Sequence, residues 1–248
     1  MKQETRWILI TGLALLTISL ALYTAHFYIF QDAHHVLIFL MGDIAFIPIE
    51  VLIVTLIIDQ LLEARERENR VEKLNMIIGT FFSSFGTSLL ATLTNMDPDI
   101  ASVRETMIIG DDWKPDQFAG VKAFLGDHAC RISGDDLDLV SLKERLLSRE
   151  DFIIRLVENP MIFEHEAFTD LVLAIHHLTE ELKARKDLRN LPPADLAHLC
   201  GDIRRVYERL VPSWLHYMEY LKKNYPYLFS LAMRTNPYDE HASVTITS

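Results

Sequence analysis

The sequence of 248 residues predicts an all-α membrane protein, in which a two-helix transmembrane hairpin continues through a long helix into a cytoplasmic helical bundle. Three observations predict this class. Formal charge is sparse in residues 1–58 and dense afterwards. The first part contains two apolar runs long enough to cross a bilayer. The second part has apolar residues at helical spacing and no useful stretch with the period of a strand.

The uneven distribution of charge narrows the possible function classes. Residues 1–58 carry six formal charges, whereas residues 59–248 carry 22 basic and 31 acidic residues, a net charge of −9. Such a split argues against an ordinary cytosolic enzyme, and 50% apolar residues argue against a disordered chain. An acidic second part without a basic patch also argues against binding to nucleic acid, because phosphate would be repelled.

The predicted spans are residues 7–30 and 36–58, within a first domain of residues 1–58. The first run is uncharged, and only Asp43 and Glu50 interrupt the second. About 20 helical residues suffice to cross the hydrocarbon core. Basic residues precede the first span and follow the second, so the positive-inside rule predicts a multi-pass protein of the cell (inner) membrane with both termini cytoplasmic.

A competing interpretation treats residues 1–25 as a cleaved signal peptide, with a small-residue site near Thr24 and Ala25. The long apolar core and the aromatic residues from Tyr23 to Tyr28 favour a retained span instead. In both cases the large domain is expected in the reducing cytoplasm. Cys130 and Cys200 are therefore expected to be free thiols.

Asp43 and Glu50 are the most informative residues of the first domain. A carboxylate at bilayer depth costs roughly 2.5–3.5 kcal/mol on insertion scales, so it usually faces protein or water. Their spacing of seven places both on nearly the same helix face. Pro48 lies between them and frees a backbone carbonyl by lacking an N–H donor. The second span thus contains a polar stretch that is able to bind cations.

Two interpretations of this stretch remain open. Folding the hairpin near residue 33 places Tyr23 at the depth of Asp43 and Ser19 near Glu50, so hydroxyl groups of the first span would satisfy both acids and fix helix packing. Alternatively, four to six copies of the second span would surround a pore with rings of Asp43 and Glu50, which would attract cations.

The remaining chain is divided into three parts. Residues 59–96 are predicted as a helical, coiled-coil-like stalk and a first cytoplasmic helix, because charges of alternating sign lead into apolar residues at helical spacing. Gly79, Ser83 and Gly86 form a small-residue stripe there, which predicts close helix contact. Residues 97–235 are predicted as a cytoplasmic helical domain. Residues 236–248 are predicted as a mobile tail.

The best metal-like cluster combines Glu164-His165-Glu166, Asp170 and His176-His177. A carboxylate-bridged site in a helical bundle would need Glu-x-x-His on facing helices, which is absent, so the stripe is predicted to be a solvated helix face. His198 and His216 are expected to be isolated histidines, packed or exposed. No catalytic motif is present. No metal, cofactor or catalytic residue is therefore predicted.

At the level of whole-chain arrangement, the sequence resembles a family of uncharacterised prokaryotic two-span membrane proteins with a cytoplasmic helical domain. Three segments carry this resemblance: Met41-Gly42-Asp43-Ile44 with Pro48-Ile49-Glu50, then Glu72-Lys73-Leu74-Asn75-Met76, and Asn159-Pro160 with Glu164 to Asp170. It implies the two-span architecture and brings no activity.

Three functional hypotheses follow, and the third is a metal-dependent enzyme built on the helix from His165 to His177. The first is a homo-oligomeric cation channel or transport pore lined by Asp43 and Glu50, with Tyr23, Pro48 and Ser19 as supporting residues. The second is a membrane-anchored helical scaffold or sensor that binds a cytoplasmic protein partner. The partners expected are the lipid bilayer, further copies of the chain and cations.

Overall fold

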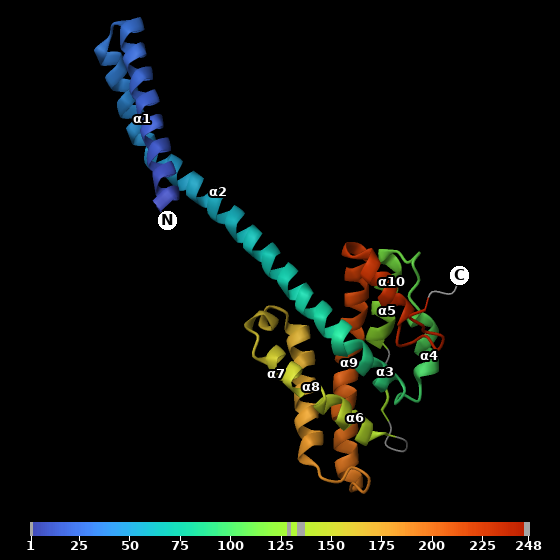
Figure 1. Cartoon of the computed structure of the whole chain (residues 1–248). Coiled ribbons are helices and arrows are strands. Elements are labelled where there is room, and N and C mark those ends of the chain that lie inside the picture. The colour runs from blue at the N-terminus through green and yellow to red at the C-terminus, as the bar shows by residue number, and fades with distance from the viewer. Residues whose placement is uncertain (1, 128–129, 133–136, 246–248) are drawn as a thin grey trace. The chain divides into compact units, whose positions relative to one another are not determined.

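The computed structural model describes residues 2–127, 130–132 and 137–245, which divide into two compact units, residues 1–67 and 68–248. Every regular element among these residues is a helix, and no strand occurs in the described part of the chain (Figure 1). The predicted all-α class is confirmed.

The first unit is a helical hairpin. It contains α1 (Lys2–Phe30) and the beginning of α2 (Ala33–Phe81), joined only by Gln31 and Asp32. Gln31 has a φ of 50°, which lets the chain reverse within two residues. The Asp32 Oδ1 atom accepts hydrogen bonds from the backbone N–H groups of His34 (2.9 Å) and His35 (3.2 Å) and so caps α2.

The helices of the hairpin have the length and composition of membrane spans. Two stretches, Arg6–Phe30 and Ala33–Thr94, contain apolar windows long enough to cross a bilayer, and none of either window is buried by protein. A core helix of a water-soluble domain would be covered by its neighbours. Here large side chains such as Trp7, Leu13 and Leu52 are exposed instead.

One helix carries the chain from the predicted second span through the predicted stalk. α2 includes Pro48 without interruption and ends at Phe81. It is followed directly by a π-helix, η1 (Phe82–Gly86), and by α3 (Thr87–Thr94). The last turns of α2 bury Leu74, Ile78 and Phe81, so the helix becomes part of the core of the second unit.

The second unit is a bundle arranged around α9. Its further elements, in chain order, are α4 (Ile100–Arg104), η2 (Glu105–Met107), α5 (Pro115–Asp127), α6 (Leu139–Leu147), α7 (Glu150–Val157), η4 (Pro160–Glu164), α8 (Glu166–Ala184), α9 (Pro193–Asn224) and α10 (Pro226–Arg234). α9 packs against α8, α10, α3, α5 and η1 (Figure 1).

The sequence of α9 explains its central place. Buried residues recur every three or four positions along it, and they include Tyr207, Leu210 and Trp214. The ring of Phe82 in η1 stacks on that of Tyr217, with centroids 4.9 Å apart and planes 17° apart. The end of α2 is thereby fixed to the middle of the bundle.

Both cysteines are free thiols, as expected. Cys130 is buried, and this burial, followed by the charges of Asp97 and Glu208, raises the pKa of its thiol to about 12. It is therefore protonated and unreactive at neutral pH.

The beginning of the segment that was predicted as a mobile tail is buried in the core. Asn236 and Tyr238 are each 1% exposed. The Asn236 Nδ2 atom donates to the carbonyl of Met107 (2.8 Å), and its Oδ1 atom accepts from the backbone N–H of Tyr238 (3.0 Å). The tail is thus anchored in the core through a long-range contact that no local sequence pattern reveals. Residues 246–248 lie outside the described residues.

We expect Asn236→Ala to lower the free energy of unfolding by roughly 1–3 kcal/mol, because it leaves the buried Met107 carbonyl and Tyr238 N–H without partners. Urea unfolding of the detergent-solubilised chain, followed by tryptophan fluorescence, measures this change. Asn224→Ala is the matched control, since the exposed Asn224 side chain only bonds the carbonyl of Tyr220 on its own helix. Equal stability of the two variants would show that the Asn236 contacts contribute nothing.

Candidate functional site

The hairpin brings three of the predicted site residues together. The Tyr23 hydroxyl donates a hydrogen bond of 2.6 Å to the Asp43 Oδ2 atom, which is the contact expected from folding the two spans together. Tyr23, Asp43 and Ser19 line one pocket of about 410 Å³, together with His26 and Phe39. Ser19 therefore lines the same pocket as Asp43, whereas the sequence analysis placed it near Glu50.

Glu50 and Pro48 lie further along α2 and are exposed. Glu50 has no hydrogen bond or ion pair within the described part of the chain. The nearby Thr17 hydroxyl donates to the carbonyls of Leu13 (3.0 Å) and Ala14 (2.8 Å) on its own helix. Within one chain the two acids thus differ, since only Asp43 has a partner.

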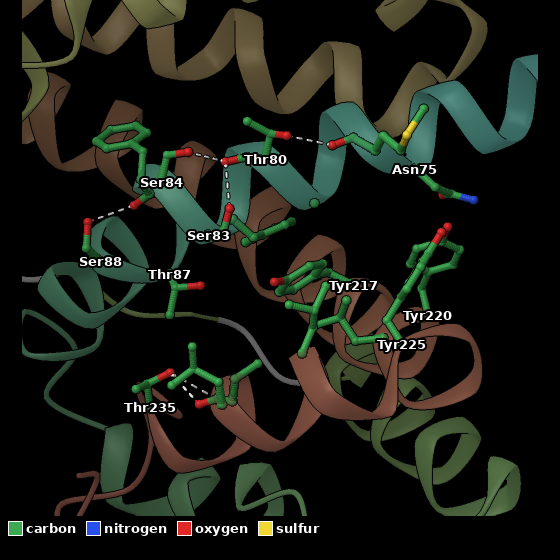
Figure 2. A pocket seen from close by; sticks show the side chains of 18 of the residues that line it. Asn75, Thr80, Ser83, Ser84, Thr87, Ser88, Tyr217, Tyr220, Tyr225 and Thr235 are labelled. Atoms are coloured by element: carbon green, nitrogen blue, oxygen red, sulfur yellow. Dashed lines mark hydrogen bonds between the residues drawn. The ribbon is translucent and has the colours of Figure 1, made fainter. Parts of the chain in front are cut away.

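A larger pocket, of about 830 Å³, lies entirely within the second unit (Figure 2). The end of α2, η1, α3, α9 and α10 supply its walls. Its lining residues are Asn75, Met76, Gly79, Thr80, Phe82, Ser83, Ser84, Phe85, Thr87, Ser88, Ala91, Tyr217, Tyr220, Leu221, Tyr225, Leu228, Leu231, Ala232, Thr235 and Val244. None of them is Asp, Glu, Lys, Arg or His, so the pocket is uncharged.

Hydroxyl groups supply most of the polar character of this pocket. The Thr80 hydroxyl donates to the carbonyl of Met76 (2.9 Å), and that of Ser88 donates to the carbonyl of Phe85 (2.8 Å). The Thr235 hydroxyl donates in the same way to the carbonyl of Leu231 (3.0 Å). These protons are therefore used by the backbone, and the oxygen lone pairs remain as acceptors for a ligand.

The π-helix η1 shapes one wall of the pocket. The Thr80 carbonyl accepts hydrogen bonds from the hydroxyls of both Ser83 (3.2 Å) and Ser84 (2.5 Å), as Figure 2 shows. A β-carbon placed on Gly86 would lie 2.5 Å from Phe81 Cε1 and 2.8 Å from Phe82 Cδ1, so only glycine fits. π-Helical turns within α-helices are frequent at functional sites.

Two tyrosines of the pocket, Tyr217 and Tyr220, have raised pKa values and remain neutral at physiological pH. Burial raises the pKa of Tyr217. Burial, and then a hydrogen bond with Tyr225, raises the pKa of Tyr220 to about 12. The phenols therefore contribute aromatic surface and hydroxyl groups without adding charge.

Comparison with known proteins identifies the relatives of this chain. The N-terminal helical domain of the MJ1433 family matches residues 2–62, and the family's C-terminal helical domain matches residues 70–234. The "Uncharacterized protein MJ1433" of Methanocaldococcus jannaschii is 42% identical over 241 residues, which cover 97% of each chain. The chain belongs to the MJ1433 family. No solved structure matches it.

Membership of the MJ1433 family confirms the resemblance to an uncharacterised family and the helical nature of both parts. The family names carry no activity. Within this MJ1433-family chain, the functional argument therefore depends on the geometry of its sites.

The histidines differ from their predicted roles. The His165 Nδ1 atom accepts a hydrogen bond of 3.1 Å from the backbone N–H of Phe168, so His165 caps α8. His177 points toward α9, where it approaches Asp202. His198 is exposed, which is one of the two environments expected for it, and its Nε2 atom lies 3.3 Å from the Asp202 Oδ2 atom. Asp202 was not predicted, because its approach to His177 depends on how α8 packs against α9.

The pocket was also missed by sequence analysis. The sequence feature at this place is the stripe of Gly79, Ser83 and Gly86, which predicts a close helix contact and not a pocket. Gly86 does not show such a contact, because the rings of Phe81 and Phe82 that cover it belong to the same continuous stretch of helix. Gly79 instead faces the pocket, where Tyr217 is 4.0 Å from the position of an added β-carbon.

We expect Gly86→Ala to lower the free energy of unfolding by about 1–3 kcal/mol, because the added methyl group overlaps the two phenylalanine rings. Gly201→Ala is the matched control, since nothing lies within 4 Å of a β-carbon at that position in α9. Alanine there is expected to be neutral or to stabilise the helix by up to about 1 kcal/mol. Thermal unfolding of both variants measures the difference, and a neutral Gly86→Ala would contradict the close packing of η1.

Proposed function

We propose that this protein is a membrane-anchored sensor whose cytoplasmic helical domain binds an uncharged, predominantly apolar small molecule. The observation that carries the proposal is the pocket of about 830 Å³ without any charged lining residue. Its volume lies in the range typical of small-molecule sites. The proposal keeps the sensor of the second sequence hypothesis and replaces its protein partner by a small molecule.

The lining of the pocket defines the chemistry of its ligand. A charged group bound there would lose its hydration without gaining a counter-ion, which is costly. Aromatic faces and leucines favour a hydrocarbon or aromatic body, whereas the hydroxyl oxygens favour one or two hydrogen-bond donors. A long-chain alcohol or a related neutral molecule has this combination.

The helix α2 supports a sensing role. Its apolar part has the properties of a membrane span, and its last turns contribute Asn75, Met76, Gly79 and Thr80 to the pocket. Occupancy of the pocket therefore acts on the helix that would enter the bilayer. The basic residues that flank the two spans support a hairpin in the cell membrane with both termini cytoplasmic.

Photoaffinity labelling of membranes that contain the full chain tests this function. We expect a diazirine-bearing octanol to label α9, α10 or η1, and a diazirine-bearing octanoate to label them at least about tenfold less. Gly79→Leu fills the pocket and should abolish this labelling. Gly201→Leu adds the same side chain to an open surface of α9 and should retain it. Peptide mapping locates the label, and labelling confined to the two spans would refute the proposal.

A second candidate function is a cation pathway formed by several copies of α2. This candidate is favoured by the environment of Glu50. Its side chain is exposed within an apolar stretch and has no partner among the described residues. An unpaired carboxylate in a span usually faces water or another protein surface. In a homo-oligomer, rings of Glu50 and Asp43 would face a water-filled pore and the neighbouring copies of α2.

For this candidate, purified protein in liposomes should conduct cations, and Glu50→Gln should reduce the flux at least about tenfold. Asp43→Asn is expected to have a smaller effect, because Asp43 is already bonded to Tyr23. Glu63→Gln, in the solvated part of α2, is the matched control. Absence of flux from wild-type liposomes, or equal flux in all variants, would exclude conduction.

A further inference from the structure

Two pairs of ionisable residues face one another across the contact between α8 and α9. His177 and Glu181 are four residues apart on α8, and His198 and Asp202 are four residues apart on α9. Residues at this spacing lie on the same helix face, one turn apart. Glu181, His198 and Asp202 each offer one ligand atom, and these atoms all lie within 4.8 Å of one another.

The separations between these atoms are short and similar. The Asp202 Oδ2 atom lies 3.3 Å from His198 Nε2 and 3.5 Å from His177 Nε2. The Glu181 carboxylate lies 3.6 Å from His198 Nε2 and 4.0 Å from His177 Nε2. Tetrahedral ligands about 2.0–2.1 Å from a Zn²⁺ ion are about 3.3–3.4 Å from one another, so the two separations from Asp202 are close to the edges of such a site and Glu181 would move inward to complete it.

Asp202 gives the second, independent indication of a ligand. Its side chain is 3% exposed, and its Oδ1 atom accepts a hydrogen bond of 2.5 Å from Arg205. Its Oδ2 atom is buried and has no hydrogen-bond partner within the described part of the chain, although it faces both imidazoles. An unsatisfied buried carboxylate oxygen is costly, and a bound cation would remove this cost.

Two arginines hold the carboxylates in place from outside. Arg205 bonds the outer oxygen of Asp202, and the Arg185 Nη1 atom bonds the Glu181 Oε2 atom at 2.7 Å. Asp195 fixes Arg185 in turn through two hydrogen bonds of 2.9 and 2.6 Å. The Arg185 hydrogen bond lowers the pKa of Glu181 and keeps it ionised. Outer-shell contacts of this kind orient metal ligands.

We propose that His177, Glu181, His198 and Asp202 form a binding site for a divalent transition-metal ion, with Zn²⁺ as the preferred ion. The two carboxylates supply negative charge toward the ion, and each also bonds an arginine on its outer side. Imidazole ligands disfavour Mg²⁺ and Ca²⁺, and the absence of a thiolate from the four ligands disfavours Cu⁺. Glu181, His198 and Asp202 are the three residues whose ligand atoms all lie within 4.8 Å of one another. With His177 as the fourth ligand no position would stay open, so the ion would be structural and would connect α8 to α9.

The accessibility of the ligands is consistent with metal entry from solvent. The side chains of His177 and His198 are 48% and 52% exposed, whereas Asp202 forms the buried end of the site. The competing interpretation is a metal-free cluster in which the two imidazoles pair directly with the carboxylates. This cluster would need no ion and would bind none specifically.

Metal titration of the full-length, detergent-solubilised protein separates these two interpretations. The affinity tag is removed and the protein is treated with a chelator before Zn²⁺ is added in a calorimeter. We expect one Zn²⁺ ion per chain and an upward shift of the midpoint of thermal unfolding. Co²⁺ should give the visible absorption of a tetrahedral complex, which adventitious surface binding does not produce.

Matched variants locate the ion. Asp202→Asn removes a proposed ligand and retains a hydrogen-bond acceptor for Arg205. His198→Gln changes a half-exposed residue, so this variant tests the site even if Asp202→Asn does not fold. Each should weaken Zn²⁺ binding roughly 100-fold. Asp151→Asn and His241→Gln, at exposed positions, should change nothing. Unchanged affinity in His198→Gln, or no stoichiometric binding to the wild type, would overturn the proposal in favour of the metal-free cluster.

Discussion

The exposed apolar surface of α1 and α2 is the constraint on which the rest of the structure depends. Neither apolar window has any part covered by protein, and exposure of so much hydrocarbon to water is strongly unfavourable. A lipid environment would resolve this problem. Within it, polar groups would need partners, and the Asp43 carboxylate has one in Tyr23 of the neighbouring helix.

The end of α2 and the π-helix that follows it form one wall of the pocket. α2 passes into the π-helix η1, and the wider turn brings Ser83 and Ser84 onto one carbonyl, that of Thr80. Gly86 permits this turn because the rings of Phe81 and Phe82 occupy the space of a side chain. The Phe82 ring then stacks on Tyr217 of α9, so the wall of the pocket is fixed by the core of the bundle.

Sequence patterns identified the features that depend on neighbouring residues. Helical spacing predicted the class of fold and the continuation of the second span into a stalk, and the hairpin geometry predicted the contact between Tyr23 and Asp43. The buried start of the tail was not predicted, because Asn236 bonds Met107, 129 residues earlier in the sequence. The cluster of His177 and Asp202 was missed for a similar reason, since it depends on the register of α8 against α9.

The two proposed sites of the second unit lie on different parts of α9 and differ in charge. His198 and Asp202 lie near its beginning, in a charged cluster, whereas Tyr217 and Tyr220 lie about four turns later, in an uncharged pocket. A cation has no ligand in the pocket, and an apolar molecule has no surface to bury in the cluster. Trp214 and Leu210, fully buried between them, complete the helix as a rigid support for both. The proposed small-molecule site and the proposed metal site are therefore chemically independent, and each is tested by substitutions of its own residues.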